Sequence, residues 1–274
     1  MEPNFAVRAH DLAEKKTPEE LAEIVSSYGF RSIQLVFGKA FDAPSYDDAY
    51  VARVKKALES KNISVSMLGA YFNPVHSHID VIRKGVENFE ENLRISHAFG
   101  GAYVGTETGS YNDSPWTYVP KNHTEEGCQA TKKVFTELAS YAEKVHGQVL
   151  LEPAWGHVIY SSSVLERLLK ELHSPAVYVT IDLFNLLYEG NFEQRDDIFL
   201  SALKTFRKDI KVIHLKDAKI VDGKMVQLAP GEGDFHYDLM LQAIKQYCPS
   251  AVLTFEGVKA DKIRSSLAFL QKLW

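Results

Sequence analysis

The chain has 274 residues, of which 45% are hydrophobic and 24% charged, a composition that excludes a disordered, collagen-like or coiled-coil protein. Its 31 Lys and Arg against 36 Asp and Glu give a net charge of −5, which disfavours a nucleic-acid-binding protein because such proteins usually present a basic face. No stretch approaches the ~18 consecutive apolar residues of a membrane span, and the first residues lack the basic and apolar regions of a secretory signal.

Eight short runs of β-forming residues recur along the whole chain. Each is apolar or alternating and is bounded by Gly, Pro, Asn or charged residues, as strands are. Continuous apolar runs such as VLL and AVLTF are typical of strands that are buried on both faces of a parallel sheet. The predicted strands are Phe5–Ala9, Ser32–Val36, Ser64–Ala70, Ala102–Thr106, Gln148–Glu152, Val177–Asp182, Lys211–Lys216 and Ala251–Glu256.

Amphipathic helical patterns lie between these runs. The first begins at Thr17 as the N-cap, with Pro18 at the first helical position and Glu20 completing a capping box, and it ends at Gly29. The other predicted helices are Tyr46–Glu59, Ile79–Phe99, Thr124–Val145, Ser161–Leu172, Phe192–Arg207, Tyr237–Tyr247 and Lys259–Leu270.

Eight strands that alternate with eight helices predict a closed (β/α)8 TIM barrel. Dividing 274 residues by eight gives roughly 34 per unit, which suits βα units of ~30 residues. No low-complexity linker divides the chain, so residues 1–274 are expected to form a single domain. The longest irregular segment, 105–123, follows the fourth strand and is interpreted as a long active-site loop, because long loops in compact domains are usually functional.

Polar side chains end the last four predicted strands. These strands end in VLLEP, VTIDLFN, VIHLKD and LTFEG, which place Glu152, Asp182, His214 and Glu256 directly after buried apolar runs. Catalytic groups of such barrels project from the C-terminal strand ends, so these four side chains are expected to converge. Three carboxylates in one pocket repel one another unless a cation compensates them, and this predicts a shared divalent metal ion: Mn²⁺, Mg²⁺, Co²⁺ or Zn²⁺.

The strand-end motifs, together with the following PGEGDF segment, resemble those of the xylose isomerase-like barrel superfamily of sugar isomerases and epimerases. The resemblance runs from the first predicted strand to the last. It implies the metal set Glu152, Asp182, His214 and Glu256, with Glu152 and Glu256 also serving as the acid and base. Where many members carry a His three residues beyond the strand-six Asp, this chain has Asn185, at a position where the resemblance implies a substrate contact.

The expected activity is therefore that of a metal-dependent isomerase or epimerase. It would act on a ketose, sugar phosphate or inosose by proton transfer through a metal-stabilised enediolate. An inosose-type dehydratase would use the same enediolate and is the main alternative. An abasic-site endonuclease-like hydrolase and a non-catalytic sugar-binding barrel are further alternatives. No Walker loop or dinucleotide fingerprint is present, so no nucleotide cofactor is expected.

Several side chains near the strand ends are candidates for substrate contact. Each also has a structural alternative, such as an ion pair for the lysine, loop packing or a solvated loop for the others. Besides Asn185, the candidates are His157, Lys216, Trp155, Glu107 and His76.

The two cysteines point to a reducing compartment. Cys128 and Cys248 lie 120 positions apart and form no CxxC pair, so free thiols are expected. Together with the missing signal and span, this predicts a cytoplasmic protein that contacts a small sugar-like molecule, and neither nucleic acid nor membrane. A homo-oligomer is left open.

Overall fold

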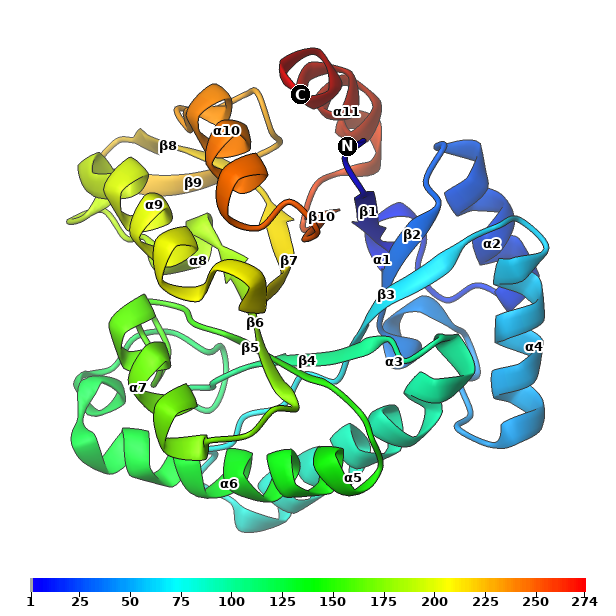
Figure 1. Cartoon of the computed structure of the whole chain (residues 1–274), viewed down its shortest axis with the longest axis horizontal. Helices are drawn as coiled ribbons and strands as arrows, with labels where there is room; N and C mark the ends of the chain where they lie inside the picture. The colour runs from blue at the N-terminus through cyan, green and yellow to red at the C-terminus, as the bar shows by residue number, and fades with distance from the viewer. Residues whose placement is uncertain (1) are drawn as a thin grey trace.

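The computed structural model describes residues 2–274, and its eight parallel strands close into a barrel (Figure 1). Around the barrel the strands follow the order β1-β10-β7-β6-β5-β4-β3-β2, so neighbours in the sequence are neighbours in the sheet. This confirms the predicted (β/α)8 fold. The strands are β1 (Phe5–Arg8), β2 (Ser32–Leu35), β3 (Ser64–Gly69), β4 (Tyr103–Glu107), β5 (Val149–Glu152), β6 (Val177–Asp182), β7 (Ile210–Leu215) and β10 (Val252–Phe255).

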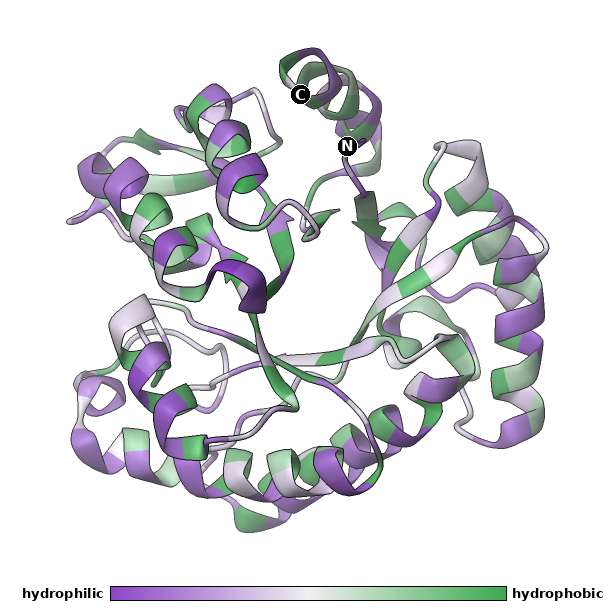
Figure 2. Cartoon of the chain, in the orientation of Figure 1, coloured by the Kyte–Doolittle hydropathy of each residue, from purple (hydrophilic) through white to green (hydrophobic). Residues whose placement is uncertain are grey.

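The helices form an outer ring whose faces alternate between hydrophobic and hydrophilic residues (Figure 2). Apolar side chains from the inner helix faces and from the strands form one continuous buried core. The longer helices are α2 (Pro18–Ser27), α4 (Asp48–Glu59), α5 (Ile79–Ser96), α6 (Glu125–Lys144), α7 (Ser162–Leu172), α9 (Arg195–Phe206), α10 (Tyr237–Tyr247) and α11 (Ala260–Leu273). Short helices are α1 (Ala9–Leu12), α3 (Phe37–Ala40) and α8 (Leu183–Leu186).

A small apolar cluster fills the barrel beneath the strand ends. Met67, Leu150 and Val212 come from β3, β5 and β7, so one layer is contributed by alternate strands, as expected for this fold. Gly105 on β4 makes room for it, because a Cβ there would lie 2.0 Å from the Met67 side chain. The barrel interior at this level is thus a packed core.

The predicted elements agree with the structure apart from a few differences. Thr17 caps α2 with the expected capping box, and Gly29 follows that helix with a positive φ of 85°. One β-hairpin was missed: β8 (Asp217–Val221) pairs antiparallel with β9 (Lys224–Leu228). The signal was present, because Asp222-Gly223 between two apolar runs is a strong hairpin turn, and both residues have positive φ.

Candidate metal centre and adjoining cavity

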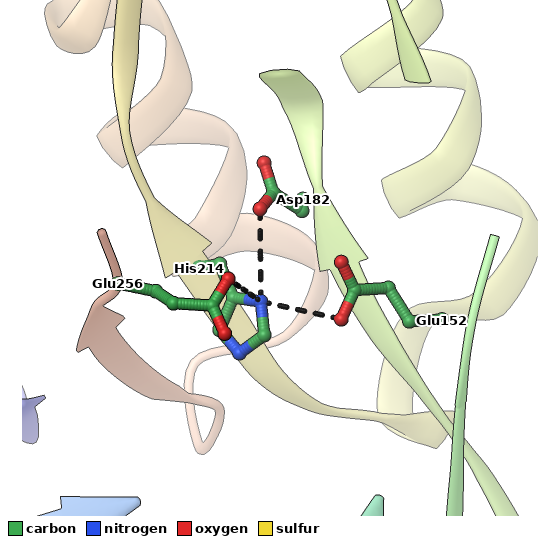
Figure 3. Close-up of side chains that lie close together, drawn as sticks. All are labelled: Glu152, Asp182, His214 and Glu256. Atoms are coloured by element: carbon green, nitrogen blue, oxygen red, sulfur yellow. Dashed lines mark ion pairs between the residues drawn. The ribbon is translucent and has the colours of Figure 1, made fainter. Parts of the chain in front are cut away.

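Four buried side chains meet at the C-terminal end of the barrel (Figure 3). Glu152 and Asp182 end β5 and β6, His214 lies near the end of β7, and Glu256 follows β10. One ligand atom from each lies within 4.8 Å of the others. His214 Nδ1 is 3.3 Å from Glu152 Oε2, 3.7 Å from Asp182 Oδ2 and 3.2 Å from Glu256 Oε2. The structure thus brings together the four residues that the sequence singled out.

The other ring nitrogen of His214 is held by an amide. His214 Nε2 lies 2.9 Å from Gln34 Oε1, and the Gln34 amide nitrogen donates in turn to Tyr71 Oη and Glu256 Oε1. Because this network makes Nε2 the donor, the deprotonated Nδ1 can offer its lone pair to a metal ion held among the carboxylates. Nδ1 is buried and has no hydrogen-bond partner among residues 2–274. A histidine whose far N–H is anchored while its near nitrogen faces carboxylates fits a divalent metal ion.

Two cations also reach this cluster. Lys216 Nζ lies 2.6 Å from Asp182 Oδ2 and 2.8 Å from Glu256 Oε2, and its side chain is only 8% exposed. Arg8 Nη1 lies 3.1 Å from Glu256 Oε1. Buried carboxylates are tolerated only when charge and hydrogen bonds compensate them. Lys216 and Arg8 provide that compensation for Asp182 and Glu256.

Three residues of this network were not found from the sequence. Arg8 ends β1, Gln34 lies on β2, and Tyr71 follows β3, so all three sit at the same end of the barrel as the acidic cluster. The sequence pattern that could have indicated these residues is a polar or charged residue at the end of an apolar strand. Strands five, six and eight repeat acidic residues at this position, whereas Arg8, Gln34 and Tyr71 are of three different types and form no such repeat.

The charges of the cluster set its protonation. Burial lowers the pKa of His214, but Glu256 and Glu152 outweigh burial and raise it to about 10. Burial raises the pKa of Glu256, but His214, Lys216 and Arg8 outweigh burial and hold it well below its usual value. Without a metal ion, His214 is therefore an imidazolium at neutral pH and serves as one of the cluster's cations.

Metal binding is expected to become tighter as the pH rises. A ligating Nδ1 must lose its proton, so below the His214 pKa of about 10 each bound ion releases one proton. The affinity for Mn²⁺ should then increase by about tenfold per pH unit between pH 6 and 8. Calorimetry in buffers of different ionisation enthalpy counts the released protons. An affinity that does not change with pH would contradict this assignment.

A cavity of about 770 Å³ opens beside the cluster. None of the four clustered residues lines it, but Glu107 and Asn185 do. Asn185 Nδ2 donates to Glu152 Oε1 at 2.6 Å, and Glu107 is the register partner of Glu152 on the neighbouring strand. The cavity therefore adjoins the Glu152 side of the cluster. Residues 114–118 of the loop after β4 also line it, and the active-site role of residues 105–123 stays a prediction.

The residues predicted to contact substrate fall into three places. Glu107, Trp155, His157 and Asn185 line the cavity, while Lys216 lies inside the cluster. His76 does not line this cavity. Its Nε2 lies 3.9 Å from Asp113 Oδ2.

Trp155 is part of an aromatic stack. Its ring is stacked on Tyr188 at 4.1 Å and on Tyr118 at 4.7 Å between centroids. The two tyrosines make no ring contact with each other in residues 2–274, which places them on opposite faces of the indole. Stacking of Trp155 itself on a sugar, as the sequence suggested, is therefore blocked in this arrangement. The ring instead ties together the loops that follow β4, β5 and β6.

Glu107 is half-buried, and its carboxyl accepts no hydrogen bond from residues 2–274. Burial raises its pKa to about 8, and Glu152 and Glu256 add to the shift. The side chain is therefore uncharged at neutral pH in the metal-free protein. Ionisation of such a carboxyl lowers the stability of the folded protein.

Glu107→Gln is expected to stabilise the metal-free protein at alkaline pH. Because the folded pKa lies above the ordinary value of 4.5, stability should fall as the pH rises between about 4.5 and 8. Glutamine removes this loss, so the melting temperature should exceed that of the wild type by an amount on the order of 5 °C at pH 8, with little difference at pH 4.5. Thermal unfolding at both pH values in EDTA measures it. Equal curves at pH 8 would show that Glu107 ionises freely.

A family model described as xylose isomerase-like TIM barrel matches residues 22–273. The chain belongs to this family. No curated protein matches this xylose isomerase-like barrel by sequence. Within residues 2–274, no helix combines the length and the apolar character needed to cross a bilayer.

Solved structures share the fold of this xylose isomerase-like barrel at low sequence identity. The 3-keto-D-glucoside 4-epimerase of E. coli is 17% identical, with a TM-score of 0.75 and 99% of each chain covered. A D-tagatose 3-epimerase-like protein is 15% identical, with a TM-score of 0.78 and 98% of this chain and 96% of that one covered. The probable 3-DHS dehydratase of Bacillus anthracis is 14% identical, with a TM-score of 0.73 and coverages of 97% and 98%. At these identities the likeness shows a shared fold and selects no reaction.

Proposed function

We propose that this protein is a divalent-metal-dependent isomerase or epimerase, working in the cytoplasm on a ketose, sugar phosphate or inosose. The observation that carries the proposal is the buried set Glu152, Asp182, His214 and Glu256, with an unpartnered Nδ1 facing the carboxylates beside an open cavity. These four side chains would hold the ion. When bound, a divalent cation polarises a substrate carbonyl and stabilises the negative charge that develops on its oxygen.

The protein side chains account for the proton transfers. Glu152 ends β5 and Glu256 follows β10, and β6 and β7 lie between these strands. Two carboxylates so placed reach a bound sugar from different sides. Glu152 removes the proton from the carbon next to the carbonyl. Glu256, which is ionised in the free protein, first takes up a proton from the adjacent Lys216 ammonium and then delivers it to the opposite face, which inverts that carbon. Asn185 orients Glu152, and the Lys216 ammonium is placed to donate a hydrogen bond to a substrate oxygen.

A dehydratase of the inosose type is the second candidate. Loss of a hydroxyl group from the carbon beside the enediolate needs a proton donor, and Glu107 supplies an uncharged carboxyl next to Glu152. The same first proton abstraction by Glu152 then leads to elimination.

The test is proton exchange in D₂O. The protein is incubated with Mn²⁺ and a panel of ketoses, their phosphates and inososes, and NMR follows each carbon. We expect deuterium at a carbon beside the carbonyl, with formation of an epimer or an isomer. An unsaturated product would select the dehydratase. No exchange with any member of the panel in Mn²⁺, Mg²⁺, Co²⁺ or Zn²⁺ would refute the proposed activity.

A further inference from the structure

The cavity beside the cluster must receive a part of the substrate that does not react. A sugar that places its carbonyl at Glu152, Asp182, His214 and Glu256 has its reacting carbons there, yet none of these residues lines the cavity. A volume of about 770 Å³ is also in the upper part of the range of roughly 300–1,000 Å³ that small-molecule sites occupy. One hexose ring held at the cluster leaves most of this space unfilled.

The walls of the cavity have the chemistry of a sugar-ring site. Trp116, Phe184 and Tyr188 supply aromatic surface. His157 lines the same space: its side chain is buried, and its Nδ1 has no hydrogen-bond partner in residues 2–274. Burial lowers the pKa of His157 to about 4, so the imidazole is neutral and can accept a hydrogen bond from a hydroxyl group. Aromatic surface beside a few fixed polar groups is typical of small-molecule binding sites.

The charges of the cavity argue against an anionic group. In the part of the chain that the structure describes, its lining contains no Lys or Arg, and it contains two glutamates, Glu107 and Glu189. Glu189 is exposed, and its Oε1 accepts a hydrogen bond from the backbone N–H of Met225. A phosphate or carboxylate in this space would contact no Lys or Arg of the lining and would meet at least one carboxylate. The group that occupies it is therefore uncharged.

We propose that this cavity binds the second, uncharged sugar ring of a glycoside, so that the substrate is a neutral keto-glycoside. This inference rests on the proposed function, and it narrows the substrate from any ketose, sugar phosphate or inosose. The keto ring is held at the cluster, and the second ring packs against Trp116, Phe184 and Tyr188. Asn185 and Glu107, which lie between the two places, face the link between the rings.

The test compares ketones that differ only in the second ring. Deuterium exchange is measured with methyl 3-keto-glucoside, with a neutral 3-keto-disaccharide, and with the analogue whose second ring is a glucuronate. We expect the KM of the neutral disaccharide to be about tenfold lower than that of the methyl compound, since aromatic contacts with a whole ring are gained. The glucuronate should lose most of this gain. Equal KM values for the methyl compound and the neutral disaccharide would overturn the inference.

Two variants probe two lining residues of the cavity. Trp116→Ala should raise the KM of the neutral disaccharide about five- to tenfold and leave that of the methyl compound unchanged. Tyr247→Ala is the matched control, because Tyr247 is a partly exposed aromatic residue on α10 outside the cavity. Glu189→Lys changes an exposed residue, so the fold is retained, and it should lower the KM of the glucuronate analogue. An equal effect of Trp116→Ala on both neutral ketones would contradict a second-ring site.

A binding measurement separates this inference from the proposed reaction. Saturation-transfer NMR with maltose, which carries no ketone, reports contact of a second ring without turnover. If no ketone exchanges deuterium, the proposed reaction fails, whereas saturation transfer to maltose that is lost in Trp116→Ala still supports the cavity's role. Exchange of the methyl compound without any saturation transfer to maltose would support the reaction and overturn the second-ring site.

Discussion

Glu152→Gln is expected to abolish proton exchange while the protein stays folded. General acid–base groups contribute about 10²–10⁴-fold to the rate, and loss of a negative ligand weakens metal binding as well, so the rate should fall about 10³-fold or more at fixed Mn²⁺. Glutamine keeps the shape of the side chain, and its Oε1 can still accept the hydrogen bond from Asn185. The measurement is deuterium incorporation into the best substrate, with thermal unfolding as the check on the fold.

The metal and proton roles of Glu152 are separated by titrating the metal ion. If saturating Mn²⁺ restores exchange in Glu152→Gln to the wild-type rate, Glu152 is only a ligand and its role as the base is wrong. Glu256→Gln is a less clean variant, because Arg8 and Lys216 both pair with Glu256 and would lose a charged partner. Its loss of activity would be mixed with a loss of stability.

Lys216→Met is expected to destabilise the metal-free protein far more than the metal-loaded protein. Without an ion, Lys216 compensates the buried Asp182 and Glu256 carboxylates, and breaking a buried pair costs about 3–5 kcal/mol. The melting temperature in EDTA should therefore fall by about 10 °C. A divalent ion supplies the missing charge, so in saturating Mn²⁺ the fall should be less than half as large. The affinity for Mn²⁺ should rise, because a competing cation has been removed.

Lys211→Met is the matched control for this variant. Lys211 lies on the same strand, β7, and its ammonium is at the surface, where it donates to the backbone carbonyl of Lys208. Its removal should change neither the stability in EDTA nor the metal affinity. If Lys216→Met lowers the melting temperature equally with and without Mn²⁺, Lys216 is an ordinary structural ion pair rather than a counter-ion that the metal replaces.

The ends of the later strands could be predicted because each combines two strong signals. A run such as VLL or VTI is buried on both faces, and the first polar residue after it marks the C-terminal end. Glu152, Asp182, His214 and Glu256 all follow this pattern, and barrel closure brings them together. The hairpin of β8 and β9 also had a local signal, the Asp222-Gly223 turn, which was overlooked.

Contacts across the barrel left no signal in the sequence. Arg8 meets Glu256 across 248 positions of the chain, from 8 to 256, and Gln34 meets His214 across 180. No local sequence pattern marks either pair. The closure of the barrel decides which of the first strands faces which of the last strands. The same holds for Trp155, whose stacking partners come from two other loops.

The amino-acid order alone determined the alternation of strands and helices, the closed barrel and the four residues of the candidate metal centre. The alternation follows from the spacing of hydrophobic residues within each segment. The four residues follow from the rule that the parallel strands of a barrel have their C-terminal ends at the same edge. The tertiary structure alone decided that Lys216 and Arg8 compensate the carboxylates, that His214 presents Nδ1, and that a cavity without cations adjoins Glu152. Charge balance and cavity shape depend on distances between side chains that are remote in the chain, and only the folded barrel fixes those distances.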